Sequence, residues 1–173
     1  YIYKIKIMDK IIYKKTSLKK VFEIKLKPFQ DFRGIYLETY NKIFYKHFNL
    51  NFIQDDISKS KYKVLRGVHG DYKTWKLITC LSGSFYLLVV NNNKRSKFYK
   101  KWTSFILSDK NFKQILIPPG FGNGHLVLTK EAIFHYKQTT LYDRESQFTI
   151  KYNDPDFNFK WPIKNPILSK RDE

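Results

Sequence analysis

Apolar and polar residues alternate in short runs along most of this 173-residue chain. A period of two residues is typical of strands that bury one face. The runs expected to be strands are 21–26, 35–40, 52–54, 75–82, 85–90, 96–106, 113–117, 126–128 and 132–139. Turn signals separate them at intervals of roughly ten residues, a spacing typical of all-β sandwiches and barrels. The pattern therefore predicts an all-β fold.

Three segments depart from this pattern. Residues 42–48 are the best candidate for a short helix. Residues 1–15 alternate only partly, and an edge strand, an arm onto a partner and a frayed end all remain open. Pro155 and Pro162 break the tail into loops and short segments. No repeat or low-complexity linker divides the chain, so we expect a single domain over residues 1–173.

The composition bounds the possible partners. Hydrophobic residues make up 42% and aromatic residues 18% of a chain whose formal net charge is +18. Such a charge suggests nucleic acid, an anionic membrane surface or an anionic substrate. The lysines are scattered, however, and the sequence contains no zinc-finger spacing, helix-turn-helix or RNA-recognition aromatics. We interpret the charge as solvated surface with some attraction for a phosphorylated ligand, and expect no nucleic-acid partner.

Cys80 is the only cysteine, so an intramolecular disulfide is impossible and a reducing cytoplasm is the expected setting. Its apolar neighbours indicate a buried strand thiol. No apolar segment reaches the length of a membrane span, and residues 1–7 lack the long apolar centre of a signal peptide. We therefore expect a cytoplasmic protein without a membrane partner.

The densest cluster of candidate chemistry lies in residues 64–83. Within eleven positions the chain carries Arg66, His69, Lys73 and Lys76. These offer an anion binder, a group that titrates near neutral pH and ammonium groups able to stabilise an oxyanion. Gly67 and Gly70 suit a backbone turn or the close approach of a ligand. A basic surface hairpin with one solvated histidine is an equally good interpretation of this segment alone.

The order of the strands and turns resembles a cupin, a jelly-roll barrel that here would carry short peripheral helices. Metal-binding cupins have a His-x-His motif, a downstream Glu and a further His. This chain offers only His69, Asp71 and His125, and no Glu follows at the family's spacing. A metal needs three or four converging ligands. The resemblance therefore implies no metal.

Within the cupins, the chain is similar to the nucleotide-sugar 3,5-epimerases typified by dTDP-4-dehydrorhamnose 3,5-epimerase. The matching segments are 31–38, 52–60, 65–69, 76–77, 117–121, 136–142 with Glu145, 153–155, 161–162 and 169–172. They follow the family's order from about residue 20 to the end. Each segment is weak evidence alone, but together they are specific.

The resemblance implies a substrate whose 4-ketone acidifies the neighbouring C3 and C5 hydrogens of a nucleoside-diphosphate sugar. A base removes a proton, an enolate forms, and a proton returns to the opposite face, with no cofactor. By resemblance His69 is the base, paired with Asp172, and Tyr136 is the acid. Lys76 would stabilise the enolate oxygen. Without the resemblance, Asp172 fits a disordered terminus, Tyr136 a core or surface position, and Lys76 a solvent-facing position.

The resemblance also assigns binding residues. Arg66 would lie near the sugar and diphosphate, whereas Gln54 and Ser60 belong to a polar strand lining the sugar site. Arg33 and Glu38 match positions that contact the nucleotide, often from the neighbouring subunit of a homodimer. The remaining substrate-binding candidates are Lys73, Asn123, His125 and Tyr142. Ordinary surface or turn roles fit Arg33, Glu38, Gln54 and Ser60 nearly as well.

Two departures from the family bear on the substrate. Residues 120–125 read Gly-Phe-Gly-Asn-Gly-His, where the family has Gly-Phe-Ala-His-Gly-Phe. Residues 70–74 replace a usual Tyr-Gln pair. Both segments resemble those of the subgroup that acts on GDP-4-keto-6-deoxyheptoses for bacterial capsule or lipopolysaccharide. The resemblance therefore implies a GDP-linked sugar in preference to a dTDP-linked one. The alternative is a non-catalytic nucleotide-sugar-binding cupin. A 3,4-ketoisomerase would carry a different histidine pair, which is missing.

Overall fold

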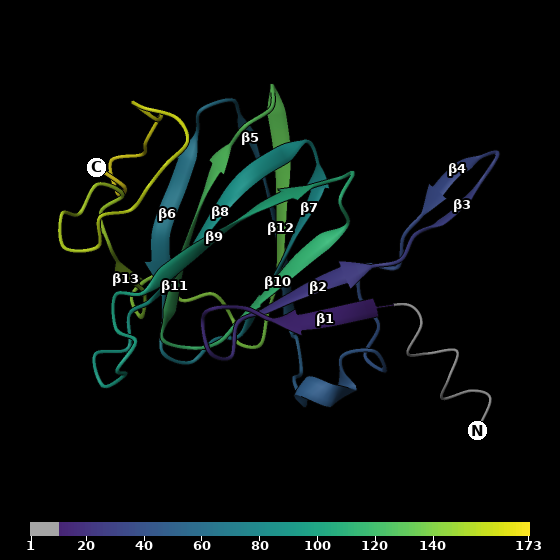
Figure 1. Ribbon diagram of the computed structural model, residues 1–173, viewed down its shortest axis with the longest axis horizontal. Helices are drawn as coiled ribbons and strands as arrows, with labels where there is room; N and C mark the ends of the chain where they lie inside the picture. Colours follow the sequence, from purple (N-terminus) through teal and green to yellow (C-terminus); the bar gives the residue numbers. More distant parts are fainter. Residues whose placement is uncertain (1–10) are drawn as a thin grey trace.

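The computed structural model describes residues 11–173, which fold into two antiparallel sheets (Figure 1). The six-stranded sheet runs in the order β1 (Ile11–Lys15), β2 (Phe22–Leu26), β10 (Lys113–Ile117), β7 (Lys76–Ser82), β12 (Glu131–Gln138) and β5 (Gln54–Lys61). The five-stranded sheet runs in the order β13 (Phe148–Thr149), β6 (Leu65–Gly70), β11 (Phe121–Val127), β8 (Ser84–Asn91) and β9 (Trp102–Ser108). The all-β, cupin-like architecture predicted from the sequence is confirmed.

The main core contains the inward apolar side chains of both sheets. Ile78 on β7 and Ile115 on β10 share it with Leu87 and Val89 on β8, and all four are fully buried. Alternation places every second side chain of these strands on the inner face. Two further clusters are formed with residues 37–52 and with the C-terminal segment 148–161. The main core thus lies between the two sheets.

A separate hairpin, β3 (Phe29–Asp31) and β4 (Gly34–Tyr36), extends away from both sheets (Figure 1). The predicted turn at residues 31–34 is present, and Asp31 accepts hydrogen bonds from the backbone and side chain of Arg33. The side chain of Phe32 at its tip is 98% exposed. The predicted strand 35–40 was too long, because pairing between β3 and β4 ends at Tyr36.

Other boundaries also differ from the prediction. The expected helix 42–48 is only a 3-10 turn, η1 (Lys46–Phe48), which ends where Asn49 adopts a left-handed conformation. Turns occupy the beginning of the expected strand 96–106, so β9 starts at Trp102. Conversely, β11 starts at Phe121, inside the segment expected to be a corner. For the two strands, the pairing partner, which the local sequence does not reveal, sets the boundary.

The described part of the N-terminal segment is a strand. Residues 11–15 form the edge strand β1, paired with β2. The remainder of the proposed edge strand or arm, residues 1–10, lies outside the described residues. None of the helices within residues 11–173 has the length and apolar character needed to cross a membrane. Cys80 is buried on β7 as predicted, and burial raises the pKa of its thiol to about 12.

Candidate active site

A cavity of about 450 Å³ is lined by strands of both sheets and by the C-terminal segment. Polar side chains enter it from β5, β6, β7, β11 and β12. The residues predicted from the sequence that line it are His69, Lys76, Tyr136, Asp172, Gln54, Arg66, Asn123, His125 and Tyr142. The fold thus brings all four predicted catalytic residues into one cavity.

The side chains of His69 and Asp172 are in close contact inside this cavity. Nε2 of His69 lies 2.7 Å from Oδ1 of Asp172, whose side chain is only 4% exposed. Ser169 donates a hydrogen bond to Oδ2 at 2.9 Å, and the backbone N–H of Asp172 donates to the Ser169 carbonyl. Burial by itself raises the pKa of Asp172, but His69 and Ser169 together lower it below its ordinary value. The disordered terminus considered for Asp172 is therefore wrong.

An irregularity between β6 and β11 orients His69 and Arg66. Asn123 pairs with His69 and His125 pairs with Arg66, so three steps along β6 match two along β11. A β-bulge of this kind changes the direction of side chains and allows both β6 residues to reach the cavity. Gly67 permits it, since its φ is +117° and a Cβ there would lie 2.6 Å from Cα of Gly124. Gly67 thus lies inside a strand and not at the predicted turn, and the neighbour that approaches it closely in this structure is the backbone of β11.

Tyr136 enters the cavity from β12 and lies opposite Asp56 on β5 and Ile78 on β7. Burial, followed by the charge of Asp56, raises the pKa of the Tyr136 phenol to about 12. Asp56 itself accepts hydrogen bonds from Gln54 at 2.8 Å and Gln138 at 3.0 Å. The phenol of Tyr136 therefore stays protonated throughout the physiological range and can donate a proton.

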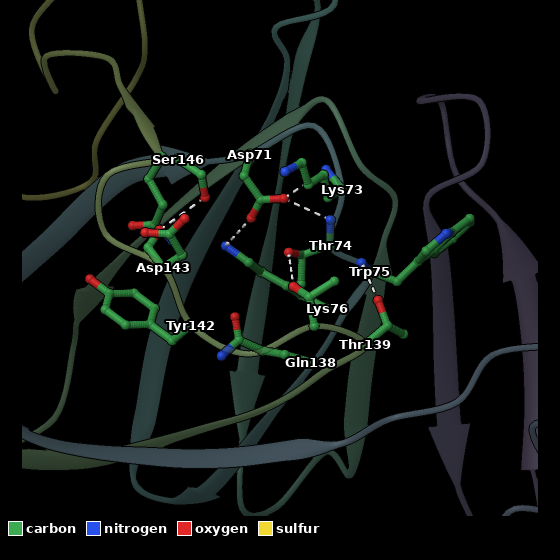
Figure 2. Close-up of polar contacts among 12 residues, drawn as sticks. Asp71, Lys73, Thr74, Trp75, Lys76, Gln138, Thr139, Tyr142, Asp143 and Ser146 are labelled. Carbon is green, nitrogen blue, oxygen red and sulfur yellow. Dashed lines mark hydrogen bonds and ion pairs between the residues drawn. The ribbon is translucent and has the colours of Figure 1, made fainter.

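Lys76 is buried at the start of β7, and its side chain reaches toward Asp71 (Figure 2). Its Nζ lies 4.0 Å from Oδ2 of Asp71. Burial lowers the pKa of the Lys76 ammonium, whereas the negative charge of Asp71 opposes this shift and Arg171 adds to it. The solvent-facing position considered from the sequence is wrong. Lys76 is a buried amine that lines the cavity, where a positive charge acts strongly on a developing oxyanion.

His125 and Asn123 line the cavity from β11. The ring of His125 stacks on Phe134 with centroids 4.1 Å apart and planes 11° from parallel. Complete burial, with a smaller effect of Arg66, lowers the pKa of His125 to about 3, so the ring is neutral at physiological pH. Within residues 11–173, Oδ1 of Asn123 and Nε2 of His125 are buried without a hydrogen-bond partner. Both atoms are available to a ligand.

Hydrogen bonds hold the remaining predicted polar residues of the cavity. Nε of Arg66 donates to the hydroxyl of Ser60 at 3.0 Å, so Ser60 supports Arg66 and does not itself line the cavity. Gln54 accepts a hydrogen bond from the backbone N–H of Tyr142 at 2.7 Å. This bond fixes the loop after β12 against β5 at the cavity wall.

Besides Ser60, three predicted binding residues lie outside the cavity lining. Arg33 is exposed near the tip of the β3–β4 hairpin, and Glu38 accepts a hydrogen bond from Asn41 at 2.6 Å in the segment that follows. Lys73 is exposed in the turn between β6 and β7, where its backbone N–H donates to Asp71. A single protomer therefore does not bring these three residues to the cavity.

The sequence analysis missed several lining residues. They are Asp56, Ile57, Ser58, Ile78, Phe134, Gln147, Ser169 and Arg171. The alternation along β5 places Asp56 and Ser58 on the same face as Gln54, a signal that could have identified both. The side chain of Arg171 bonds to Gln147 at 3.1 Å, and no local pattern predicts this long-range contact.

The donor set does not assemble into a metal centre. Asp71, one member of the degenerate set considered from the sequence, pairs with Lys76, whereas His69 pairs with Asp172. Among the residues that the structure describes, no three His, Cys, Asp or Glu side chains are grouped so that they could hold a metal ion. The residues in the cavity are arranged for proton transfer and anion binding.

Known proteins resemble this chain over most of its length. The family model described as dTDP-4-dehydrorhamnose 3,5-epimerase matches residues 15–173. The enzyme of that name from Shigella flexneri is 37% identical over 164 residues, which is 91% of each chain. The crystal structure of the Elizabethkingia anophelis enzyme is 37% identical, has a TM-score of 0.86 and covers 94% of this chain and 93% of its own.

A further crystal structure contains a ligand. The dTDP-6-deoxy-D-glucose-3,5-epimerase of Legionella pneumophila, in complex with dTDP-4-keto-L-rhamnose, is 33% identical with a TM-score of 0.89, covering 94% of this chain and 89% of its own. The family model and these relatives agree over nearly the whole described chain. The protein therefore belongs to the dTDP-4-dehydrorhamnose 3,5-epimerase family and is an isomerase of nucleoside-diphosphate 4-keto sugars.

Proposed function

We propose that this protein inverts C3, C5 or both in a nucleoside-diphosphate 4-keto-6-deoxy sugar, without a cofactor, and that its substrate is a GDP-4-keto-6-deoxyheptose of capsule or lipopolysaccharide synthesis. The observation that carries the reaction is the His69–Asp172 pair in one cavity with Lys76 and Tyr136. A base, an enolate stabiliser and a protonated phenol are the groups that the reaction requires.

In this mechanism His69 removes the proton next to the ketone. Its Nε2 faces Asp172, so the other ring nitrogen accepts the substrate proton. The buried carboxylate stabilises the imidazolium that results and fixes the tautomer of the ring, as in other His–carboxylate pairs. The ammonium of Lys76 stabilises the enolate oxygen. The substrate carbon loses its proton, the electron pair moves onto the former ketone oxygen, and no group is oxidised.

Tyr136 then returns a proton to the opposite face of the sugar ring, and the ketone re-forms. The raised pKa of this phenol, about 12, keeps it protonated before the reaction. Once it has donated its proton, it recovers one from solvent. Arg66 and Asn123 bind the diphosphate side and the sugar side of the ligand, respectively, in keeping with their positions at the cavity wall.

The proposed heptose specificity rests on the residues that depart from the usual family pattern. Asn123 and His125 line the cavity, and each has a buried polar atom without a protein partner. Gly122 and Gly124 flank Asn123 but do not line the cavity, because a Cβ at either position would meet the side chain of Val68 at 3.0–3.1 Å. The relative from Legionella pneumophila binds a dTDP-linked hexose, so dTDP-4-keto-6-deoxyglucose is the competing substrate.

The same proposal includes a homodimer. The β3–β4 hairpin exposes Phe29, Phe32, Ile35 and Tyr36 on a projection that packs against neither sheet of its own protomer (Figure 1). Arg33 lies on this hairpin, away from the cavity of the same chain. Docking of the hairpin on a second copy would bury these apolar side chains and carry Arg33 toward the nucleotide of the partner.

The substrate can be identified by proton NMR of the protein in heavy water. We expect the C3 signal, the C5 signal or both to disappear from a GDP-4-keto-6-deoxyheptose, and exchange with dTDP-4-keto-6-deoxyglucose to be slower. Faster exchange of the dTDP sugar would overturn the heptose assignment and retain the epimerase. Nucleotide binding without exchange of either sugar would identify a non-catalytic binding protein.

We expect Tyr136→Phe to slow epimerisation by about 10²-fold or less, because solvent can supply the returning proton. This effect is smaller than that expected for loss of the base His69. Deuterium incorporation should fall less than inversion, since the base still removes the proton. Tyr62→Phe, at a tyrosine that does not line the cavity, is the matched control. Equal loss of deuterium incorporation and inversion would show that Tyr136 is needed before the enolate forms.

A further inference from the structure

The carboxylate of Asp71 is fixed in a direction that faces Lys76. Its Oδ1 accepts hydrogen bonds from the backbone N–H groups of Lys73 at 2.8 Å and Thr74 at 2.6 Å. This leaves Oδ2 directed at Nζ of Lys76, 4.0 Å away (Figure 2). The carbonyl of Asp71 also accepts a hydrogen bond from Gly120 at 2.7 Å. The turn between β6 and β7 thus holds the acid in place without contact with the ligand cavity.

Both members of this pair are desolvated. The side chains of Asp71 and Lys76 are 7% and 9% exposed, respectively. A buried ammonium without a counter-charge tends to lose its proton, because burial penalises the charged form. Among the described residues, Asp71 is the one carboxylate within ion-pair distance of Lys76. An opposite charge within about 4–6 Å favours the charged form by roughly 1–3 pKa units.

Other charges around the cavity favour the neutral amine. Arg171 lowers the pKa of Lys76 further, in the same direction as burial. The titratable and charged groups that share the cavity with Lys76 are Arg66 and His69 on β6, His125 on β11, Asp56 on β5, Tyr136 on β12, Tyr142 in the loop after β12, and Arg171 and Asp172 near the C-terminus. The carboxylates of this set engage other groups, Asp172 with His69 and Asp56 with two glutamines.

We infer that Asp71 is a positioning residue that keeps Lys76 protonated and aimed at the substrate ketone, without touching the substrate itself. This inference rests on the proposed role of Lys76 in the reaction. It assigns Asp71, which the sequence analysis considered only as a degenerate metal ligand, to the charge balance of the active site. The backbone of the turn 71–74 then fixes the orientation of the Asp71 carboxylate, which is the counter-ion of Lys76.

The test is Asp71→Asn, because the amide oxygen can still accept both backbone hydrogen bonds while the charge is lost. We expect the alkaline limb of the kcat/KM profile to move to lower pH by roughly 1–3 units. The ratio of variant to wild-type activity should fall as the pH rises and recover as the pH is lowered. Asp154→Asn is the matched control, since Oδ1 of Asp154 accepts a similar backbone bond outside the cavity.

A second readout does not depend on turnover. In protein labelled with ¹³C-lysine, the resonance of Lys76 is assigned by its loss in Lys76→Arg, and its titration midpoint is compared between wild type and Asp71→Asn. A lower midpoint in the variant supports the inference. An unchanged midpoint, or activity reduced by the same factor at every pH, would show that Asp71 only stabilises the turn.

Folding and function are separated by two further comparisons. If Asp71→Asn does not fold, Asp71→Ser retains a hydroxyl acceptor for the turn and replaces it in both measurements. If both variants unfold while Asp154→Asn folds, Asp71 is structural and the inference is wrong. If wild type exchanges no ring hydrogen of any 4-keto sugar, the proposed function fails, and the titration of Lys76 still decides the pairing with Asp71.

Discussion

His69→Ala is expected to lose the solvent exchange of ring hydrogens almost completely. A general base positioned at the reacting carbon contributes about 10²- to 10⁴-fold. Among the residues that line the cavity, Asp56 and Asp172 are the carboxylates. In the variant Asp56 stays bonded to Gln54 and Gln138. Asp172 loses His69 but is still held by Ser169, and the proposed mechanism places it on the side of the imidazole away from the substrate. Exchange of the C3 and C5 hydrogens, followed by NMR in heavy water, measures the effect directly.

The control for this prediction is His47→Ala. His47 is exposed, stacks on Tyr13 and lies outside the cavity lining, so its loss should leave exchange unchanged. Nucleotide affinity, measured by calorimetry, should be similar in wild type and both variants, because His69 acts on the sugar. Near-normal exchange in His69→Ala would show that another group is the base.

Asp172→Asn is expected to reduce kcat by roughly 10⁴-fold, the effect seen when the carboxylate of a catalytic His–carboxylate pair is replaced by an amide. The amide stabilises the wrong tautomer of His69 and cannot stabilise the imidazolium. Ser169 can still bond to the new side chain, so the C-terminal segment should stay in place. Exchange of C3 and C5 hydrogens gives the rate, and Asp156→Asn, at an exposed carboxylate paired with Lys100, is the control.

The same variant has a pH signature in stability. The pKa of Asp172 is lower in the folded protein than in the unfolded chain, so its charged form stabilises the fold above the unfolded pKa. That contribution is lost as the pH falls through the folded pKa. The difference in Tm between wild type and Asp172→Asn should therefore be largest near neutral pH and shrink in acid. A constant difference would contradict the assigned shift.

Local pattern predicted the strands whose inner faces are apolar. The expected strands at 21–26, 85–90, 113–117 and 132–139 match β2, β8, β10 and β12 closely. Boundaries were wrong where pairing partners decide them, as at β9 and β11, because a strand ends where its neighbour ends. The sequence did not predict the β-bulge at Gly67. It indicated only that a glycine at this position suits a turn or a close approach. The close approach of Gly124 explains it.

The amino-acid sequence alone determined which chemical groups are available to this protein. His69, Lys76, Tyr136 and Asp172 occur in the order that the family's pattern implies. Tertiary structure decided which of them act together. Lys73 and Lys76 are three positions apart in one basic segment, yet Lys73 is exposed and Lys76 is buried beside Asp71. Asp172 reaches His69 only because the C-terminal segment folds back across β6. Burial and charge pairing depend on contacts between distant segments, and no local pattern encodes them.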